Sequence, residues 1–144
     1  MSASRKAVIF DFIRTLYDPV TTTLYPGVRG MLEDLGSRQQ LILYSRKDHS
    51  RSELLRSTGI EHHFKTAYFV EKKDAKSLKR ILNENDLSPD RCIVVGDMVT
   101  SELAAANELG IDTVWFRQQS FAKVLDLSAS FDPTHTVRTI EELD

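Results

Sequence analysis

Five short apolar runs recur along this chain, and helix-like stretches separate them. The runs span residues 7–10, 41–44, 67–70, 92–95 and 113–116. Short runs without polar alternation are typical of strands that are buried on both faces of a parallel sheet. Strands that alternate with helices predict an α/β fold, in which right-handed crossovers place helices on both faces of the sheet.

The intervening stretches predict four helices, at residues 28–37, 50–58, 74–85 and 100–109. Gly59 and Gly110 follow two of them as stop signals, and Asp74 stands where it can cap the third. Residues 134–137 predict a sixth short strand and residues 140–143 a last helical turn, whereas residues 118–131 carry no clear pattern. We expect one domain over residues 1–144, because this length is ordinary for a single domain.

Composition excludes several classes of protein. The 19 basic and 21 acidic residues leave a net charge of −2, so there is no strong nucleic-acid signal. No apolar run is long enough to cross a membrane, and the first residues lack the apolar stretch of a secretion signal. The one cysteine, Cys92, sits in an apolar run, as expected for a buried thiol in a reducing compartment. These features predict a cytoplasmic protein with no membrane partner.

Polar residues follow the apolar runs at the points where parallel strands would end. Asp11 follows the first run, Ser45 the second, Lys72 and Lys73 the third, and Asp97 the fourth. Ligands of open α/β sheets bind at the carboxyl ends of the strands, so we expect these side chains to converge. The simpler alternative is that the acids only cap the helices that follow and the lysines are solvated.

Such a convergence can hold a metal ion and a phosphate. Two neighbouring carboxylates repel each other unless a cation lies between them, and Mg²⁺ prefers oxygen ligands of this kind. A lysine and a hydroxyl can hold the oxygens of a phosphoryl group. The remaining carboxylate oxygen can attack phosphorus as a nucleophile and form an aspartyl-phosphate.

The ordered motifs resemble the haloacid dehalogenase-like (HAD) superfamily over the whole chain. "VIFDFIRTL" is similar to the family's Asp-x-Asp-x-Thr motif except at the second acid, and "LILYS" to its second motif. Lys72 stands 25 residues before Asp97, the family's spacing for the third motif. "VGDMVTSELAAANELGI" is similar to the fourth. The resemblance implies a three-layer, Rossmann-like parallel sheet of five to six strands flanked by helices.

The resemblance also implies a Mg²⁺ site. Asp11 would be both nucleophile and metal ligand, and the backbone carbonyl of Ile13 and the carboxylate of Asp97 would be further ligands. Glu102 would orient the metal's water molecules.

The remaining family roles concern the phosphoryl group. Ser45 and Lys72 would hold it, and Thr15 would steady the loop after the first strand. No stretch between the motifs is long enough for a cap domain, which implies an open, capless site. Arg14, Arg46 and Lys73 stand beside motif residues and could form a basic rim for a phosphorylated small molecule or macromolecule. A homo-oligomer is a further possibility.

Ile13 occupies the place of the acid that protonates the leaving group in family phosphatases. General acid–base catalysis contributes about 10²–10⁴-fold in rate, so we expect slow turnover of alkyl phosphates. Two alternatives stay open. The chain is a binding or regulatory module with little catalysis, or it is a 2-haloacid dehalogenase, because halide leaves without a proton. The missing cap argues against the dehalogenase.

Overall fold

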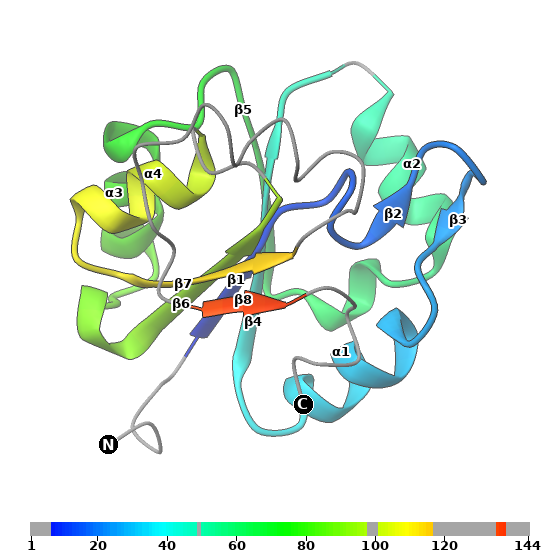
Figure 1. Ribbon diagram of the computed structural model, residues 1–144, viewed down its shortest axis with the longest axis horizontal. Helices are drawn as coiled ribbons and strands as arrows, with labels where there is room; N and C mark the ends of the chain where they lie inside the picture. The colour runs from blue at the N-terminus through cyan, green and yellow to red at the C-terminus, as the bar shows by residue number, and fades with distance from the viewer. Residues whose placement is uncertain (1–6, 49, 98–100, 117–134, 138–144) are drawn as a thin grey trace.

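The chain folds around one six-stranded sheet in which every strand pair is parallel (Figure 1). This is a computed structural model, and it describes residues 7–48, 50–97, 101–116 and 135–137. The strand order is β5-β4-β1-β6-β7-β8. The strands are β1 (Ala7–Phe10), β4 (Gln40–Arg46), β5 (Thr66–Val70), β6 (Cys92–Gly96), β7 (Asp112–Phe116) and β8 (His135–Val137). The predicted α/β fold and its sixth strand are confirmed.

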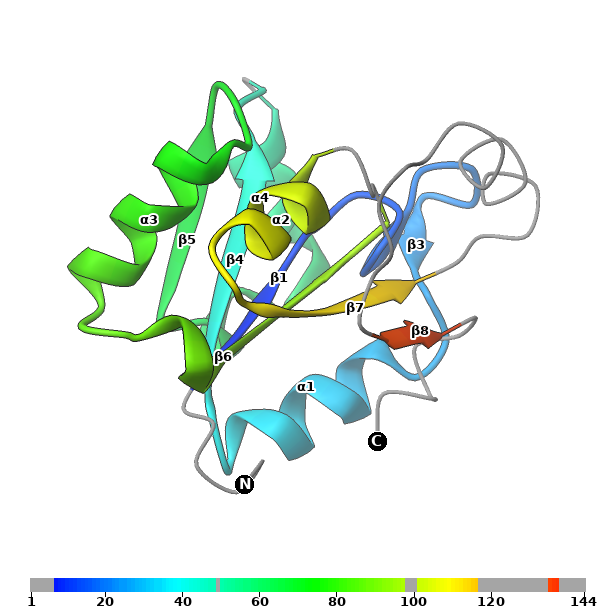
Figure 2. The ribbon, with the colours of Figure 1, turned by 60° about the vertical axis from the view of Figure 1, so that its left-hand side comes forward.

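Helices cover both faces of the sheet and make three layers, as Figure 2 shows from the side. They are α1 (Val28–Gly36), α2 (Arg51–Thr58), α3 (Ala75–Glu84) and α4 (Glu102–Glu108), with two 3₁₀ turns, η2 (Glu61–His63) and η3 (Pro89–Arg91). Successive residues of β1 point to opposite faces. Ile9 packs in the core under α3 and α4, whereas Phe10 packs in the core with α1 and α2.

Local signals set the ends of the helices close to their predicted places. The Asp74 carboxylate accepts a hydrogen bond from the Ser77 backbone N–H at 2.9 Å, and the Ser77 hydroxyl accepts one from the Asp74 backbone N–H at 3.2 Å. This reciprocal cap begins α3. Gly59 ends α2 with φ +79°, a left-handed conformation that favours glycine.

The expectation of burial on both faces is wrong for β5. Four of its five residues are only half-buried, from Thr66 to Phe69. Among the strands that the structure describes, β5 lies at the edge of the sheet and pairs with β4 alone. An apolar run therefore marks a strand here, but its position in the sheet decides how much of it is covered.

A short antiparallel hairpin follows β1 and stands beside the carboxyl ends of the strands (Figure 1). It consists of β2 (Tyr17–Asp18) and β3 (Thr23–Leu24). Apart from this hairpin, the described residues between β1 and β7 form the sheet strands β4, β5 and β6, the four helices and two 3₁₀ turns, so they contain no cap domain. None of the helices described here is long and apolar enough to span a bilayer. The segment 118–131 and the predicted C-terminal turn of helix lie outside the described residues.

Candidate active site

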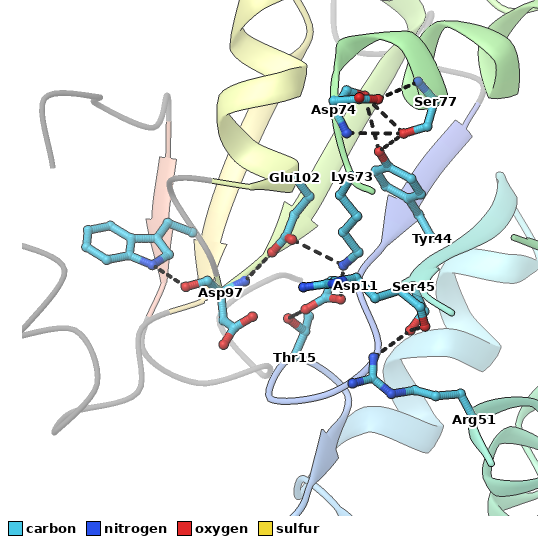
Figure 3. Close-up of polar contacts among 12 residues, drawn as sticks. Asp11, Thr15, Tyr44, Ser45, Arg51, Lys73, Asp74, Ser77, Asp97 and Glu102 are labelled. Carbon is cyan, nitrogen blue, oxygen red and sulfur yellow. Dashed lines mark hydrogen bonds and ion pairs between the residues drawn. The ribbon is translucent and has the colours of Figure 1, made fainter. Parts of the chain in front are cut away.

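Asp11 lies at the carboxyl end of β1 with both carboxylate oxygens engaged (Figure 3). Its backbone N–H donates to the Val95 carbonyl at 2.9 Å, which holds it against the end of β6. The Thr15 hydroxyl donates to Oδ2 at 3.1 Å, and the Lys73 ammonium donates to Oδ1. Only 5% of Asp11 is exposed. The Thr15 hydroxyl and the Lys73 ammonium therefore fix the carboxylate in one orientation. The role predicted for Thr15, steadying the loop after the first strand, stays a prediction.

The lysine of the site is Lys73, which corrects the choice of Lys72 made from spacing. Lys73 is 8% exposed and donates to both Asp11 and Glu102, the latter at 3.1 Å. Lys72 is exposed and lines two surface cavities, one of which it shares with Lys73. The cavity that contains Asp11 and Asp97 is lined by Lys73 and not by Lys72. Lys73 is therefore part of the interior of the site rather than of its rim.

Glu102, the first residue of α4, joins the lysine to Asp97. Its Oε2 accepts from the Asp97 backbone N–H at 3.1 Å, while its Oε1 accepts from Lys73. The Trp115 indole N–H donates to the Asp97 carbonyl at 3.2 Å. Nothing in the local sequence around Trp115 points to this contact, because Trp115 lies 18 residues beyond Asp97 along the chain.

Three buried carboxylates meet at this edge of the sheet. Ligand atoms of Asp11, Asp97 and Glu102 all lie within 4.8 Å of one another. The predicted convergence of Asp11 and Asp97 is thus observed, and Glu102 reaches the same cluster directly. Hard oxygen donors at this spacing suit a divalent cation such as Mg²⁺.

The electrostatics of the cluster favour an added cation. Burial, together with the charges of Asp11 and Glu102, raises the pKa of Asp97 to about 9. Burial alone would lower the pKa of Lys73, but the carboxylates of Asp11 and Glu102 outweigh it and raise that pKa above its ordinary value. Lys73 therefore stays charged, and one ammonium faces three carboxyl groups. This excess of negative charge fits a metal ion.

Ser45 is buried at the end of β4, but its hydroxyl is engaged by another side chain. The Arg51 guanidinium donates to Ser45 Oγ at 3.0 Å (Figure 3). Ser45 is fully buried, and Arg51 rather than Ser45 lines the cavity beside Asp11. Sequence reasoning missed Arg51, because an arginine in the first turn of a helix has no distinctive pattern. The predicted contact of Ser45 with a phosphoryl group stays a prediction.

A cavity of about 290 Å³ opens over the acids. Ile13 is half-buried in its wall, and Arg14 and Arg46 are exposed at it, next to the motif residues as expected. The complete lining is Asp11, Ile13, Arg14, Arg46, Arg51, Lys73, Asp97, Ser101 and Glu102. Acidic and basic side chains therefore face the same cavity.

Comparison with known proteins identifies the family. Residues 4–116 match the family described as haloacid dehalogenase-like hydrolase, well over half of the chain. The chain belongs to this family. A 58-residue stretch is 36% identical to glyceraldehyde 3-phosphate phosphatase of Pyrococcus furiosus, and it covers 40% of this chain but only 24% of that relative.

Solved structures of HAD proteins share the fold. A HAD phosphatase from Thermococcus onnurineus superposes with a TM-score of 0.80 at 15% identity, covering 96% of this chain and 95% of that one. The HAD-hydrolase YfnB of Bacillus subtilis, solved with bound magnesium, gives 0.79 at 13% identity and 96% of both chains. A 2-haloacid dehalogenase from Pseudomonas syringae gives 0.74 at 14% identity and 96% of both chains. At these identities the likeness concerns the fold alone.

Proposed function

We propose that this HAD protein is a Mg²⁺-dependent phosphohydrolase in which Asp11 is the nucleophile and turnover of alkyl phosphates is slow. The observation that carries the proposal is the cluster of Asp11, Asp97 and Glu102 within 4.8 Å, with Lys73 bound across two of its members. Carboxylates around a cation, beside a fixed lysine, are what phosphoryl transfer requires.

The roles of the chain's own groups follow from their contacts. Thr15 and Lys73 hold the Asp11 carboxylate, so its attacking oxygen needs little reorientation. Asp11 and Asp97 would hold Mg²⁺ with the carbonyl of Ile13, and Glu102 would orient water around it. When bound, the ion would neutralise charge on the transferring phosphoryl group. Lys73 adds positive charge at the same point, because its ammonium stays protonated beside the acids.

Ile13 determines which substrates are cleaved well. An alkoxide leaving group needs a proton as the P–O bond breaks, and a hydrocarbon cannot supply one. Aryl and acyl leaving groups depart without that help. Hydrolysis of the aspartyl-phosphate also loses its general base, so this step is slow for every substrate.

The known relatives support phosphate chemistry of this kind. The Pyrococcus furiosus relative is a phosphatase of glyceraldehyde 3-phosphate, and one solved relative is a HAD phosphatase. We propose a phosphorylated small molecule or macromolecule as substrate, reached through the open cavity above the acids. The cytoplasmic location and the homo-oligomer stay predictions from the sequence.

A phosphatase panel with and without Mg²⁺ tests the proposal. We expect Mg²⁺-dependent release of phosphate from aryl and acyl phosphates, little from alkyl phosphates, and none from Asp11→Asn. Ile13→Asp should accelerate alkyl phosphate hydrolysis by about 10²–10⁴-fold, because it restores the acid. Ile13→Asn is the matched control, since it has the shape of aspartate without its proton. Equal rates for the Asp and Asn variants would contradict the role given to position 13.

The hydrocarbon at position 13 also supports a second candidate function, that of a binding or regulatory module without significant turnover. In that case Ile13→Asp does not raise the rate of phosphate release, and no substrate releases phosphate even when Mg²⁺ and phosphate bind. Chloride release from 2-chloropropionate would instead indicate a dehalogenase.

A further inference from the structure

We propose that the substrate's leaving group is itself an anion, a carboxylate or a phosphate, which Arg46 and Arg51 bind with Arg14 beside them. The substrate is then a phosphoanhydride: an acyl phosphate or a diphosphate. This inference rests on the proposed phosphohydrolase function and narrows its substrate class.

The charges that line the cavity divide into two groups. Lys73 is committed to the acids, because its ammonium donates to both Asp11 and Glu102. The other cations in the wall are Arg14, Arg46 and Arg51. They come from three separate places, the loop after β1, the end of β4 and the start of α2. With Lys73 they make four cationic side chains against three carboxylates in the wall of a cavity of about 290 Å³. Because the lysine is paired with the acids, the arginines give the rest of the wall a positive charge that attracts an anion.

Arg51 is held in place by a buried side chain. Its guanidinium donates to the hydroxyl of Ser45, which is fully buried at the end of β4. Figure 3 shows Arg51 and Lys73 approaching this region from different sides. A guanidinium held in place loses less side-chain entropy on binding, and its planar fork matches the two oxygens of a carboxylate or phosphate. Ser45 is therefore a positioning residue for Arg51.

Ile13 in the same wall makes an anionic leaving group the chemically suitable one. The Asp11 oxygen forms a bond to phosphorus while the bridging P–O bond breaks and leaves its electron pair on the departing carboxylate or phosphate. No proton is needed in this step, and the arginines stabilise the departing charge. Water then attacks phosphorus, the bond to Asp11 breaks to restore its carboxylate, and both hydrogens of the water stay on the released H₂PO₄⁻.

Binding of two non-hydrolysable probes separates this inference from the proposed function. Methylenediphosphonate represents a diphosphate and phosphonoacetate an acyl phosphate, and inorganic phosphate is the single-anion reference. With Mg²⁺ present, calorimetry should show at least one of the two probes binding about 10- to 100-fold tighter than phosphate, the gain expected from charged hydrogen bonds. Tighter binding of methylenediphosphonate would identify the leaving group as a phosphate, and tighter binding of phosphonoacetate would identify it as a carboxylate.

Variants then assign the gain to the arginines. Arg46→Gln and Arg51→Gln should weaken the favoured probe by a larger factor than phosphate and so reduce its advantage, while Arg51→Lys should keep part of that advantage. Lys79→Gln, an exposed cation on α3, is the control. In the arginine variants, pyrophosphate or acetyl phosphate should lose a larger factor in kcat/KM than p-nitrophenyl phosphate does.

The inference would be overturned if the wild type bound phosphate and the two probes equally tightly. It would also be overturned if the arginine variants lowered the affinity for phosphate as much as the affinity for the probes. Failure of the proposed function looks different. In that case the probes still bind through the arginines, but no substrate releases phosphate.

Discussion

Replacing Gly96 with alanine should disrupt the cluster of Asp11, Asp97 and Glu102, although Gly96 has no side chain that could bind a ligand. Gly96 ends β6, and a Cβ built there would lie 2.6 Å from Glu102 Cγ and 2.8 Å from its Cδ, with Oε2 closer still. Heavy atoms do not approach so closely, so Glu102 must move. Glu102 is only 1% exposed, and it is bonded to both Lys73 and the Asp97 backbone. Glu102 borders the cavity over the acids, but a move into that cavity would break these two hydrogen bonds.

The expected loss follows from these contacts. Overpacking a dense interior costs about 1–3 kcal/mol. Weakening two hydrogen bonds to a charged group adds roughly 1.5–3 kcal/mol for each bond that is lost. We expect Gly96→Ala to lower the free energy of unfolding by about 3 kcal/mol or more, which is about 10 °C in melting temperature for a chain of this size. Mg²⁺ affinity should fall as well, because Glu102 no longer orders Lys73 and Asp97.

Thermal and chemical denaturation with matched variants tests this reasoning. Gly30→Ala is the control, because a Cβ there meets nothing within 4 Å, and this helical substitution should stabilise α1 by about 0.5–1 kcal/mol. In a Glu102→Ala background, Gly96→Ala should cost little, since the atoms that it would strike are gone. A Gly96→Ala variant as stable as wild type, or an equal loss with and without Glu102, would refute the steric argument.

Two further predictions concern the charges of the site. Lys73→Met should lower the free energy of unfolding of the metal-free protein by about 3–5 kcal/mol in denaturant titrations, because it leaves Asp11 and Glu102 unpaired in the interior. Lys72→Met is the control and should change that free energy by no more than about 0.5 kcal/mol. Equal effects of the two variants would contradict the assignment of Lys73 as the lysine of the site. The pKa of Asp97 is raised from 3.8 to about 9, so ionising it opposes folding, and its stabilising contribution is full below pH about 4 and lost as the pH rises toward 9. The melting temperature of the metal-free protein should therefore fall as the pH rises from 6 to 9. This fall should be smaller in Asp97→Asn, and saturating Mg²⁺ should reverse it in the wild type. If the melting temperatures of the wild type and of Asp97→Asn change with pH in parallel, the raised pKa of Asp97 is contradicted.

The elements of the fold could be predicted because their causes are local. Apolar runs such as residues 7–10 and 92–95 form strands wherever they can be covered, and helices begin and end at residues such as Asp74 and Gly59 whose effect reaches only a few positions. The carboxyl ends of parallel strands meet at one edge, so the convergence of Asp11 with Asp97 also followed from the order of elements.

What only the tertiary structure decided was which neighbouring side chain faces the site and what it touches there. Lys73 rather than Lys72 is buried, Arg51 engages the hydroxyl of Ser45, and Trp115 donates to Asp97 across the sheet. Each of these depends on the direction of one side chain relative to another element of the fold. The sequence locates the end of a strand to within about one or two residues, but a one-residue step in an extended segment turns the side chain to the opposite side.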